Sequence, residues 1–144
     1  SKLKKLKIRT RRAGVHNVTT KVLDSTKVMK KMKGTADRVL IDAPCSGIGV
    51  LKRNPDSKWK LEPEFVENII KTQAEILENY SKLVKVGGKL VYATCSILPS
   101  ENQEQVEKFL TSELGKEFTF VKEKKILSHE SGFDGFYMAL IERK

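Results

Sequence analysis

The chain has 144 residues, a formal net charge of +10, 39% hydrophobic residues and 32% charged residues. This composition excludes a chain that is disordered throughout and a membrane protein, and the length suits a single domain. Two cysteines 50 residues apart and two isolated histidines form neither a disulfide framework nor a metal site, so we expect a soluble protein of a reducing, cytoplasmic compartment.

The N-terminal elements are predicted to be short and polar. Residues 2–12 are typical of a helix, and Gly14 is placed to end it. Val18–Leu23 alternates in the manner of a strand. The next segment, Ser25–Gly34, is either a loop or a short basic helix.

The positive charge is concentrated in this part of the chain. Residues 1–33 contain twelve Lys or Arg and one acid, whereas the remaining residues carry a net charge of −1. A concentrated basic segment is typical of nucleic-acid binding, because neutralised phosphates release their counterions. A solvated helix whose lysines aid solubility is the alternative, and charge alone does not decide between the two.

The middle of the chain is predicted to contain a strand, a long loop and a long helix. Arg38–Asp42 is a short apolar run of the kind found in buried parallel strands. Residues 43–62 lack periodicity, and long loops inside compact domains are usually functional. A helix is predicted to begin at Pro63 and to end at Gly87–Gly88, with an apolar stripe along one side.

The C-terminal part is predicted to hold three strands and one helix. Lys89–Thr94 reads as a strand. Ser100 with Gln103 forms a capping-box pattern that opens a helix to about Leu114. The alternating segments 118–122 and 136–142 close the chain as strands.

Strands that alternate with helices predict an α/β fold with a parallel sheet. In such folds the active site lies beyond the carboxyl ends of the strands. Asp42 and Cys45 follow one strand, and Cys95 follows the next. We predict that these strands are neighbours, so that an acid and two thiols face one cleft and can support nucleophilic catalysis. Each cysteine taken alone also fits a small buried core residue.

Four stretches of the chain carry a specific resemblance to a known family. They are HNVTTKVLDSTK (16–27), DRVLIDAPCSGIGVLKRNPDSKW (37–59), GGKLVYATCSILPSENQEQV (87–106) and FDGFYMALIERK (133–144). They resemble the RNA cytosine-5 methyltransferases of the Sun/RsmB type, and DAPCSG paired with a downstream TCS is the most specific part. The resemblance covers nearly the whole chain and implies a Rossmann-like methyltransferase fold.

The resemblance also implies roles for single residues. The nucleophilic cysteine of the family's Thr-Cys motif matches Cys95, and the Pro-Cys cysteine associated with product release matches Cys45. Asp42 matches an acid near both the cofactor and the target base. Asp24 matches an acid that contacts the adenosine part of S-adenosylmethionine, and Pro44 is counted with the cofactor-binding residues. The alternatives are an N-cap for Asp24, a cap of the loop backbone for Asp42, and a rigid turn for Pro44.

The chemistry explains why such residues are needed. Carbon 5 of cytosine is a poor nucleophile until a thiolate adds at carbon 6 and turns the ring into an enamine. Asp42 can stabilise the charge that builds at ring nitrogen 3, and Cys45 can help when Cys95 leaves after methylation. A free thiol with a pKa near about 8.5 is only a few per cent ionised at pH 7, so the pocket must favour the thiolate.

The expected partner is single-stranded or opened RNA, because the target base must leave its stack, and ribosomal RNA is favoured over transfer RNA. The candidate phosphate contacts are basic residues of the N-terminal segment and the long loop: Lys4, Lys5, Arg9, Lys52, Arg53 and Lys58. Trp59 can stack on a base, and packing beneath the loop is an equally good interpretation.

The sequence also departs from the family. It contains neither the glycine-rich loop that follows the family's first strand nor the acid that ends its second strand. We therefore expect a truncated domain with half of the cofactor site, in which residues 1–33 form a basic segment and 34–144 a core that carries the motifs. The family's first two strands lie between Val18–Leu23 and Arg38–Asp42, so the edge of the latter is expected to be unpaired. We expect the chain either to associate through that edge or to leave residues 1–33 poorly ordered or repositioned.

The favoured function is the transfer of a methyl group from S-adenosylmethionine to carbon 5 of cytosine in RNA, with the isolated chain expected to be inactive. A non-catalytic RNA-binding or assembly module that retains the fold is the alternative. The intact pair of cysteines favours the enzyme.

Overall fold

The computed structural model describes residues 2–22 and 26–144, which fall into two compact units, Ser1–Lys31 and Met32–Lys144. The first unit contains helix α1 (Lys2–Arg12) and most of α2 (Thr26–Met32). The predicted helix over residues 2–12 is confirmed. Gly14 follows it with a positive φ of 66°, a conformation that glycine adopts without strain. The basic segment after Ser25 is a short helix rather than a loop.

The strand predicted at Val18–Leu23 is wrong as far as the segment is described. Residues 18–22 form no strand, and Leu23 lies outside the described residues. Val18 and Val22 are 46% and 60% exposed, so the alternation buries neither side chain. A strand needs a neighbour for its backbone N–H and C=O groups, and no strand in the described parts of the chain pairs with this segment.

The second unit contains a four-stranded mixed sheet with the order β1-β2-β4-β3. Its strands are β1 (Ala36–Asp42), β2 (Val84–Thr94), β3 (Phe118–Ile126) and β4 (Phe136–Arg143). Only β1 and β2 are parallel, and the other two pairs are antiparallel. An all-parallel sheet is therefore wrong for the last two strands. The segment from β3 to β4 holds only the single-turn helix α6 (Ser128–Ser131), too short for a parallel crossover.

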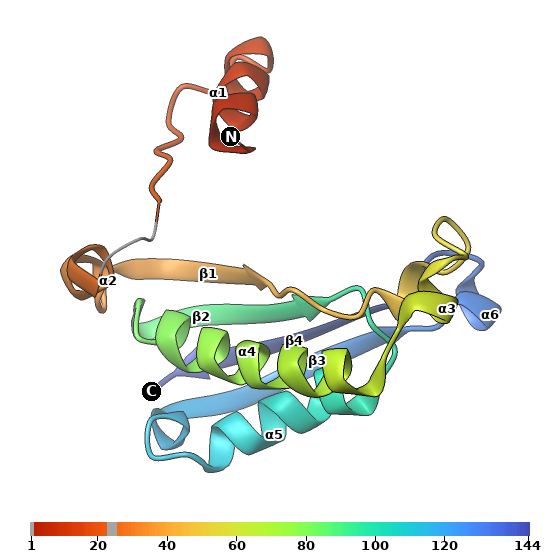
Figure 1. The fold of residues 1–144 in the computed structure, drawn as a ribbon. Helices are drawn as coiled ribbons and strands as arrows, with labels where there is room; N and C mark the ends of the chain where they lie inside the picture. The colour runs from red at the N-terminus through yellow and green to blue at the C-terminus, as the bar shows by residue number, and fades with distance from the viewer. Residues whose placement is uncertain (1, 23–25) are drawn as a thin grey trace. The chain divides into compact units, whose positions relative to one another are not determined.

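Two helices cover one face of this sheet, as Figure 1 shows: α4 (Pro63–Ser81) and α5 (Gln103–Thr111). The core between helices and sheet is built from buried apolar side chains of both layers: Ile41, Leu77, Val84, Leu90, Tyr92, Val106, Phe109, Phe118, Tyr137, Ala139 and Ile141. Phe109 of α5 meets Phe118 of β3 edge to face, with ring centres 5.4 Å apart. This packing fixes the helices against the strands whose ends carry the cysteines.

The opposite face of the sheet is lined by a cross-strand row, Leu40, Val91 and Leu140, which the strand register places side by side. Leu40 is 71% exposed. The prediction that Arg38–Asp42 is a buried strand is therefore wrong: Ile41 is the single buried residue of β1, because the helices of the described unit cover one face of the sheet.

Two predicted boundaries also differ from the structure. Helix α4 ends at Ser81, and β2 begins at Val84 and includes both glycines at 87 and 88. The register with β1 shifts between Ala36 and Arg38, so the extra residues of β2 form an irregularity that the glycines accommodate.

The helix predicted to begin at Ser100 begins at Gln103 instead and ends at Thr111. It is preceded by the 3-10 turn η2 (Pro99–Glu101). Asn102 has φ −115° and ψ −109°, outside the helical region, and no side chain caps the helix there. The predicted capping box is therefore wrong, because the helix starts only after Asn102.

The remaining elements are short. They are η1 (Ile48–Val50) and α3 (Ser57–Lys60), both inside the loop predicted over residues 43–62, and η3 (Gly115–Glu117) before β3. Among the described residues, no helix has the length and apolar character needed to cross a membrane, and no group of three or more His, Cys, Asp or Glu is placed to hold a metal ion.

Candidate active site

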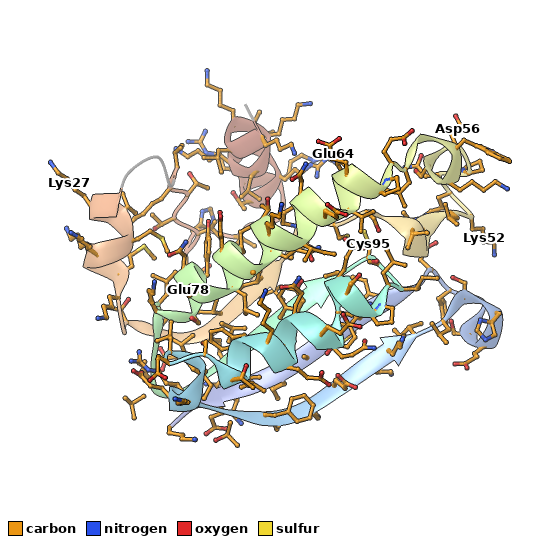
Figure 2. All side chains as sticks on the ribbon, turned by 60° about the horizontal axis from the view of Figure 1, so that its bottom comes forward. Lys27, Lys52, Asp56, Glu64, Glu78 and Cys95 are labelled. Carbon is orange, nitrogen blue, oxygen red and sulfur yellow. The ribbon has the colours of Figure 1, made fainter. Side chains whose placement is uncertain are left out.

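The two cysteines meet at the carboxyl ends of β1 and β2. These strands are parallel neighbours, as predicted, and their register pairs Asp42 with Ala93. Both cysteines are free and half-buried, and their Sγ atoms lie 3.2 Å apart, close enough for an S–H···S hydrogen bond. Figure 2 labels Cys95 just beyond the end of β2. The fold thus brings together two thiols that are 50 residues apart in the sequence.

The surroundings of Cys45 keep its thiol protonated. Burial, together with the contact with the Cys95 sulfur, raises the pKa of Cys45 to about 12. At neutral pH Cys45 is therefore a neutral thiol whose S–H can be donated to Cys95.

We expect the alkylation of Cys45 by iodoacetamide to remain slow up to pH 10 and to keep rising with pH, because only the thiolate reacts. Site-resolved mass spectrometry at low extents of reaction gives the rate at each pH. A short peptide with the sequence DAPCSG is the matched reference, and its rate should level off above a pKa of about 8.5. A Cys45 rate that levels off with the peptide would contradict the raised pKa.

A buried carboxylate links the loops that follow the two cysteines. Glu101 has no exposed surface, and its Oε1 accepts hydrogen bonds from Ser46 N (2.7 Å) and Gln73 Nε2 (3.0 Å). Its Oε2 accepts hydrogen bonds from the hydroxyls of Ser46 (2.5 Å) and Ser96. We call Glu101 and its three partners, Ser46, Gln73 and Ser96, the Glu101 network.

Sequence reasoning missed this network. The sequence feature that could have indicated the network is a repeated Cys-Ser pair: Ser46 follows Cys45, and Ser96 follows Cys95. A carboxylate that accepts from both serines was not predicted, because Glu101 lies between the two residues assigned to a helix cap.

Asn102, next to Glu101, holds the backbone on both sides of Cys95. Its Oδ1 accepts a hydrogen bond from Thr94 Oγ1 (2.5 Å), and its Nδ2 donates to the carbonyl of Ser96 (3.0 Å). Both partners and Asn102 itself are fully buried. Cys95 therefore lies on a segment whose flanking residues are fixed.

The loop after Cys45 is packed closely against Cys95 through a glycine. Gly49 N donates to the carbonyl of Cys95 (3.0 Å), and Gly135 N donates to the carbonyl of Gly49 (2.7 Å). A Cβ atom on Gly49 would lie 2.3 Å from the Gly135 oxygen and 2.6 Å from the Cys95 oxygen. Only glycine fits at this position, which lets the loop, β2 and β4 converge at the site.

Two of the three predicted cofactor-binding residues, Asp42 and Pro44, lie at the end of β1 beside the cysteines. Asp42 is exposed at the end of β1, and among the described residues its side chain has no hydrogen bond or ion pair. Pro44 is also exposed, and its carbonyl accepts a hydrogen bond from Gln73 Nε2 (2.9 Å), which ties this turn to α4. Asp24 lies outside the described residues.

The basic residues of the loop point to solvent. Lys52, Arg53 and Lys58 are all exposed, and Figure 2 labels Lys52 on the loop beyond the strand ends. Arg53 forms an ion pair with Asp134 (2.5 Å). Trp59 is 78% exposed and lies beneath the Lys58 ammonium, 4.6 Å from the ring centre, so packing of Trp59 under the loop is wrong.

The basic residues of the first unit lie on α1. Lys4, Lys5 and Arg9 are exposed there, and α1 contains no buried residue and no acid in its first turn. Such a helix presents positive charge without a packed face of its own.

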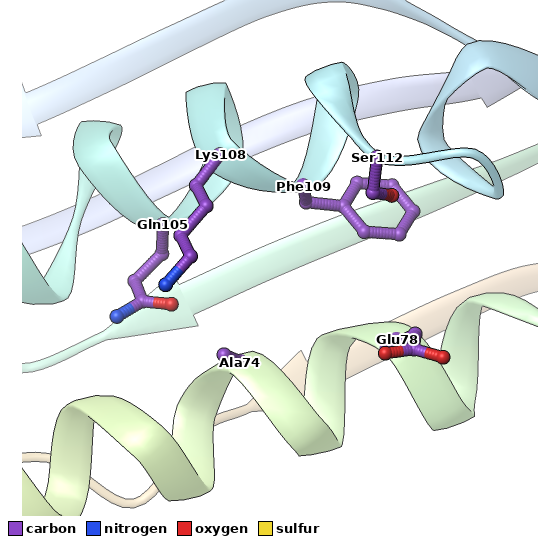
Figure 3. A pocket seen from close by; sticks show the side chains of 6 residues that line it. All are labelled: Ala74, Glu78, Gln105, Lys108, Phe109 and Ser112. Carbon is purple, nitrogen blue, oxygen red and sulfur yellow. The ribbon is translucent and has the colours of Figure 1, made fainter.

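A groove between α4 and α5 is separate from the cysteines. Figure 3 shows its lining, which consists of Ala74, Glu78, Gln105, Lys108, Phe109 and Ser112. None of these side chains belongs to the strand ends, and neither cysteine lines the groove. The candidate active site is therefore the end of β1 and β2.

Comparison with known proteins identifies the family of the chain. The sequence pattern of the 16S rRNA methyltransferase RsmB/F family matches residues 1–142. The chain belongs to this family. Methyl transfer in the RsmB/F family uses S-adenosylmethionine.

Curated relatives match most of this RsmB/F chain. Ribosomal RNA small subunit methyltransferase B of Proteus mirabilis is 44% identical over 108 residues, which is 75% of this chain and 25% of that protein. The protein of the same name from Pectobacterium carotovorum is 43% identical over 108 residues, with 72% and 25% covered. The chain thus spans about a quarter of the length of the curated relatives it matches.

Solved structures share the fold. The crystal structure of PH0851 superposes with a TM-score of 0.89 at 32% identity, over 98% of this chain and 34% of the other. NSun6 from Pyrococcus horikoshii, solved with SFG, superposes with a TM-score of 0.80 at 24% identity, over 98% and 38%. The four-stranded mixed sheet with its two helices is therefore part of a methyltransferase fold.

Proposed function

We propose that this chain carries the catalytic cysteines of an enzyme that methylates carbon 5 of cytosine in RNA, with Cys95 as the nucleophile. The observation that carries the proposal is the 3.2 Å separation of two free thiols at the ends of neighbouring parallel strands. Membership of the RsmB/F family supports an RNA substrate of ribosomal type, and two free cysteines suit a cytoplasmic location.

The described residues fit part of a site for S-adenosylmethionine. Asp42 offers an exposed carboxylate, without a partner in the described structure, that can accept hydrogen bonds from the cofactor. Pro44 offers an exposed apolar ring beside it, on a turn that Gln73 holds. When bound, S-adenosylmethionine supplies the methyl group that carbon 5 takes up.

Cys95 forms the covalent bond to the base. Its thiolate adds to carbon 6 of cytosine, the ring electrons move toward nitrogen 3, and carbon 5 becomes nucleophilic. Asp42 acts here as the acid: it donates a proton to nitrogen 3 as negative charge builds there. Because the Cys45 thiol keeps its proton, it can donate a hydrogen bond to the Cys95 sulfur. For the same reason it does not compete with Cys95 as a nucleophile toward cytosine.

Cys45 acts when the product is released. After methylation a base removes the proton from carbon 5, the bond between carbon 6 and Sγ of Cys95 breaks, and its electron pair returns to the sulfur. The neutral thiol of Cys45, 3.2 Å away, stabilises the departing thiolate by donating to it. Release without Cys45 would therefore be slow.

The activity is tested with the full-length protein and RNA labelled with tritium at carbon 5 of cytosine. Release of tritium into water that requires S-adenosylmethionine supports substitution at carbon 5. Transfer of the methyl group to RNA without tritium release would assign the reaction to another atom.

The basic helix α1 is expected to bind RNA through phosphates. Affinity should fall with salt by a log–log slope of about −0.7 for each phosphate contacted on a single strand. Reversing Lys4, Lys5 and Arg9 to Glu should weaken binding to all sequences alike and reduce the slope, as fluorescence anisotropy at several salt concentrations measures.

The control for this triple variant reverses Lys122, Lys124 and Lys125 on β3, which are also exposed and change the net charge by the same amount. It should bind RNA nearly as the unmodified protein does. Equal losses in both variants would mean that only the overall charge matters, and a loss confined to one RNA sequence would contradict phosphate binding.

A further inference from the structure

The Glu101 network is a buried cluster around a carboxylate that the proposed chemistry does not use. Glu101 is fully buried, and no cation pairs with it among the described residues. Burying a carboxylate without a cation costs free energy of folding, and burying an apolar residue of similar volume would cost less. The carboxylate therefore needs an explanation other than stability.

The hydrogen bonds of the network all converge on the carboxylate. Glu101 accepts from four donors: the N–H and hydroxyl of Ser46, the amide of Gln73 and the hydroxyl of Ser96. Each serine hydroxyl also accepts a backbone N–H two residues later, from Ile48 (3.4 Å) and Leu98 (3.1 Å). Each hydroxyl hydrogen is thereby directed at Glu101 rather than at its own loop.

These contacts join the two cysteine loops at the residues next to the sulfurs. Ser46 follows Cys45, Ser96 follows Cys95, and both hydroxyls meet at one carboxylate oxygen, with 3.3 Å between them. The two loops come from different strands and are 50 residues apart, and this tie adds to the hydrogen bond from Gly49 N to the Cys95 carbonyl in setting their spacing. A side chain with two acceptor oxygens and no donor is suited to hold all four groups.

We propose that Glu101 is a positioning residue that sets the separation of the Cys45 and Cys95 sulfurs. The inference rests on the proposed function for its catalytic consequence, but the geometry can be tested without any methyl transfer. Glu101 acts through the two serines and touches neither sulfur in the contacts given above.

The test uses phenylarsine oxide, which binds tightly only where two thiols lie close enough to bridge one arsenic atom. In the full-length protein, binding that is lost in Cys45→Ala and in Cys95→Ala is assigned to this pair. Glu101→Gln keeps the shape but puts a donor where an acceptor is needed. We expect it to weaken arsenical binding by about tenfold or more, the order expected when hydrogen bonds to a charged group are lost.

Two control variants distinguish a change in the spacing of the two sulfurs from a general loss of protein stability. Glu104→Gln makes the same chemical change on an exposed residue of α5, and Val106→Ala removes buried volume from the same helix without touching the loops. Both should retain arsenical binding, although Val106→Ala should lower the unfolding temperature. If Glu101→Gln does not fold, Ser46→Ala and Ser96→Ala each remove one tie and serve instead.

The outcomes distinguish the two proposals. Weakened arsenical binding with a lower kcat and an unchanged KM for RNA supports positioning in catalysis. Unchanged binding in Glu101→Gln, or an equal loss in Val106→Ala, would overturn the positioning role. If the unmodified protein transfers no methyl group while the arsenical pattern holds, the proposed function fails and the positioning role stands.

Discussion

Replacing Cys95 with alanine in the full-length protein is expected to abolish methyl transfer and covalent capture of RNA. The alanine has no sulfur to add to carbon 6, so carbon 5 never becomes nucleophilic. Loss of a covalent nucleophile lowers kcat by a factor on the order of 10⁴ or more. Transfer of labelled methyl groups to RNA measures the loss.

The control for Cys95→Ala is RNA affinity, which should stay unchanged because the basic residues of α1 and of the loop are intact. Unfolding temperature should also change little, since Cys95 is only half-buried. Turnover near that of the unmodified protein would show that Cys95 is not the nucleophile.

Replacing Cys45 with alanine is expected to trap the enzyme on its product. The variant can still add through Cys95 and take up the methyl group, but no thiol remains to stabilise the Cys95 sulfur as it leaves. A covalent protein–RNA adduct should accumulate and survive denaturant, and gel electrophoresis of the denatured reaction measures it. Turnover should fall while the adduct rises toward one per active site.

The double variant Cys45→Ala with Cys95→Ala is the control for this adduct and should show none. Normal turnover of Cys45→Ala with no adduct would leave Cys45 a structural residue. An adduct that persists in the double variant would place the covalent bond on another nucleophile.

The pairing of β1 with β2 could be predicted from the sequence because its signals are local. A short apolar run, a long amphipathic helix and a second apolar run define a right-handed crossover, and this topology places both carboxyl ends together. Cys95 follows its run directly, and Cys45 follows the other run after two residues. Their proximity therefore needed no information about the rest of the fold.

The Glu101 network could not be predicted in the same way, because its donors come from three separate elements. Glu101 lies one residue after Ser100, in a pattern that also fits a helix cap, and the capping interpretation satisfied every local rule. What decides the structure is the burial of Glu101 between two loops and α4, which depends on contacts 28 and 55 residues apart.

The order of the last strands was also beyond local reasoning. Alternation predicted strands near residues 118 and 136. It did not predict their order in the sheet, in which β4 lies between β2 and β3. The alternation at Val18–Val22 lacks such a partner among the described residues and leads to no strand. Alternation of apolar and polar residues therefore shows that a segment can form a strand. Whether it does so depends on a neighbouring strand with which it can pair.

The crossover that joins the two cysteine loops also has a consequence for how the site is lost. In an unfolded chain, 50 residues of flexible backbone separate the sulfurs by about 40 Å on average. Folding replaces that distance by 3.2 Å, which raises the effective concentration of one thiol at the other by orders of magnitude. Opening of the β1–α4–β2 unit would therefore end their cooperation while leaving each cysteine chemically intact, so that partial unfolding and inactivation coincide.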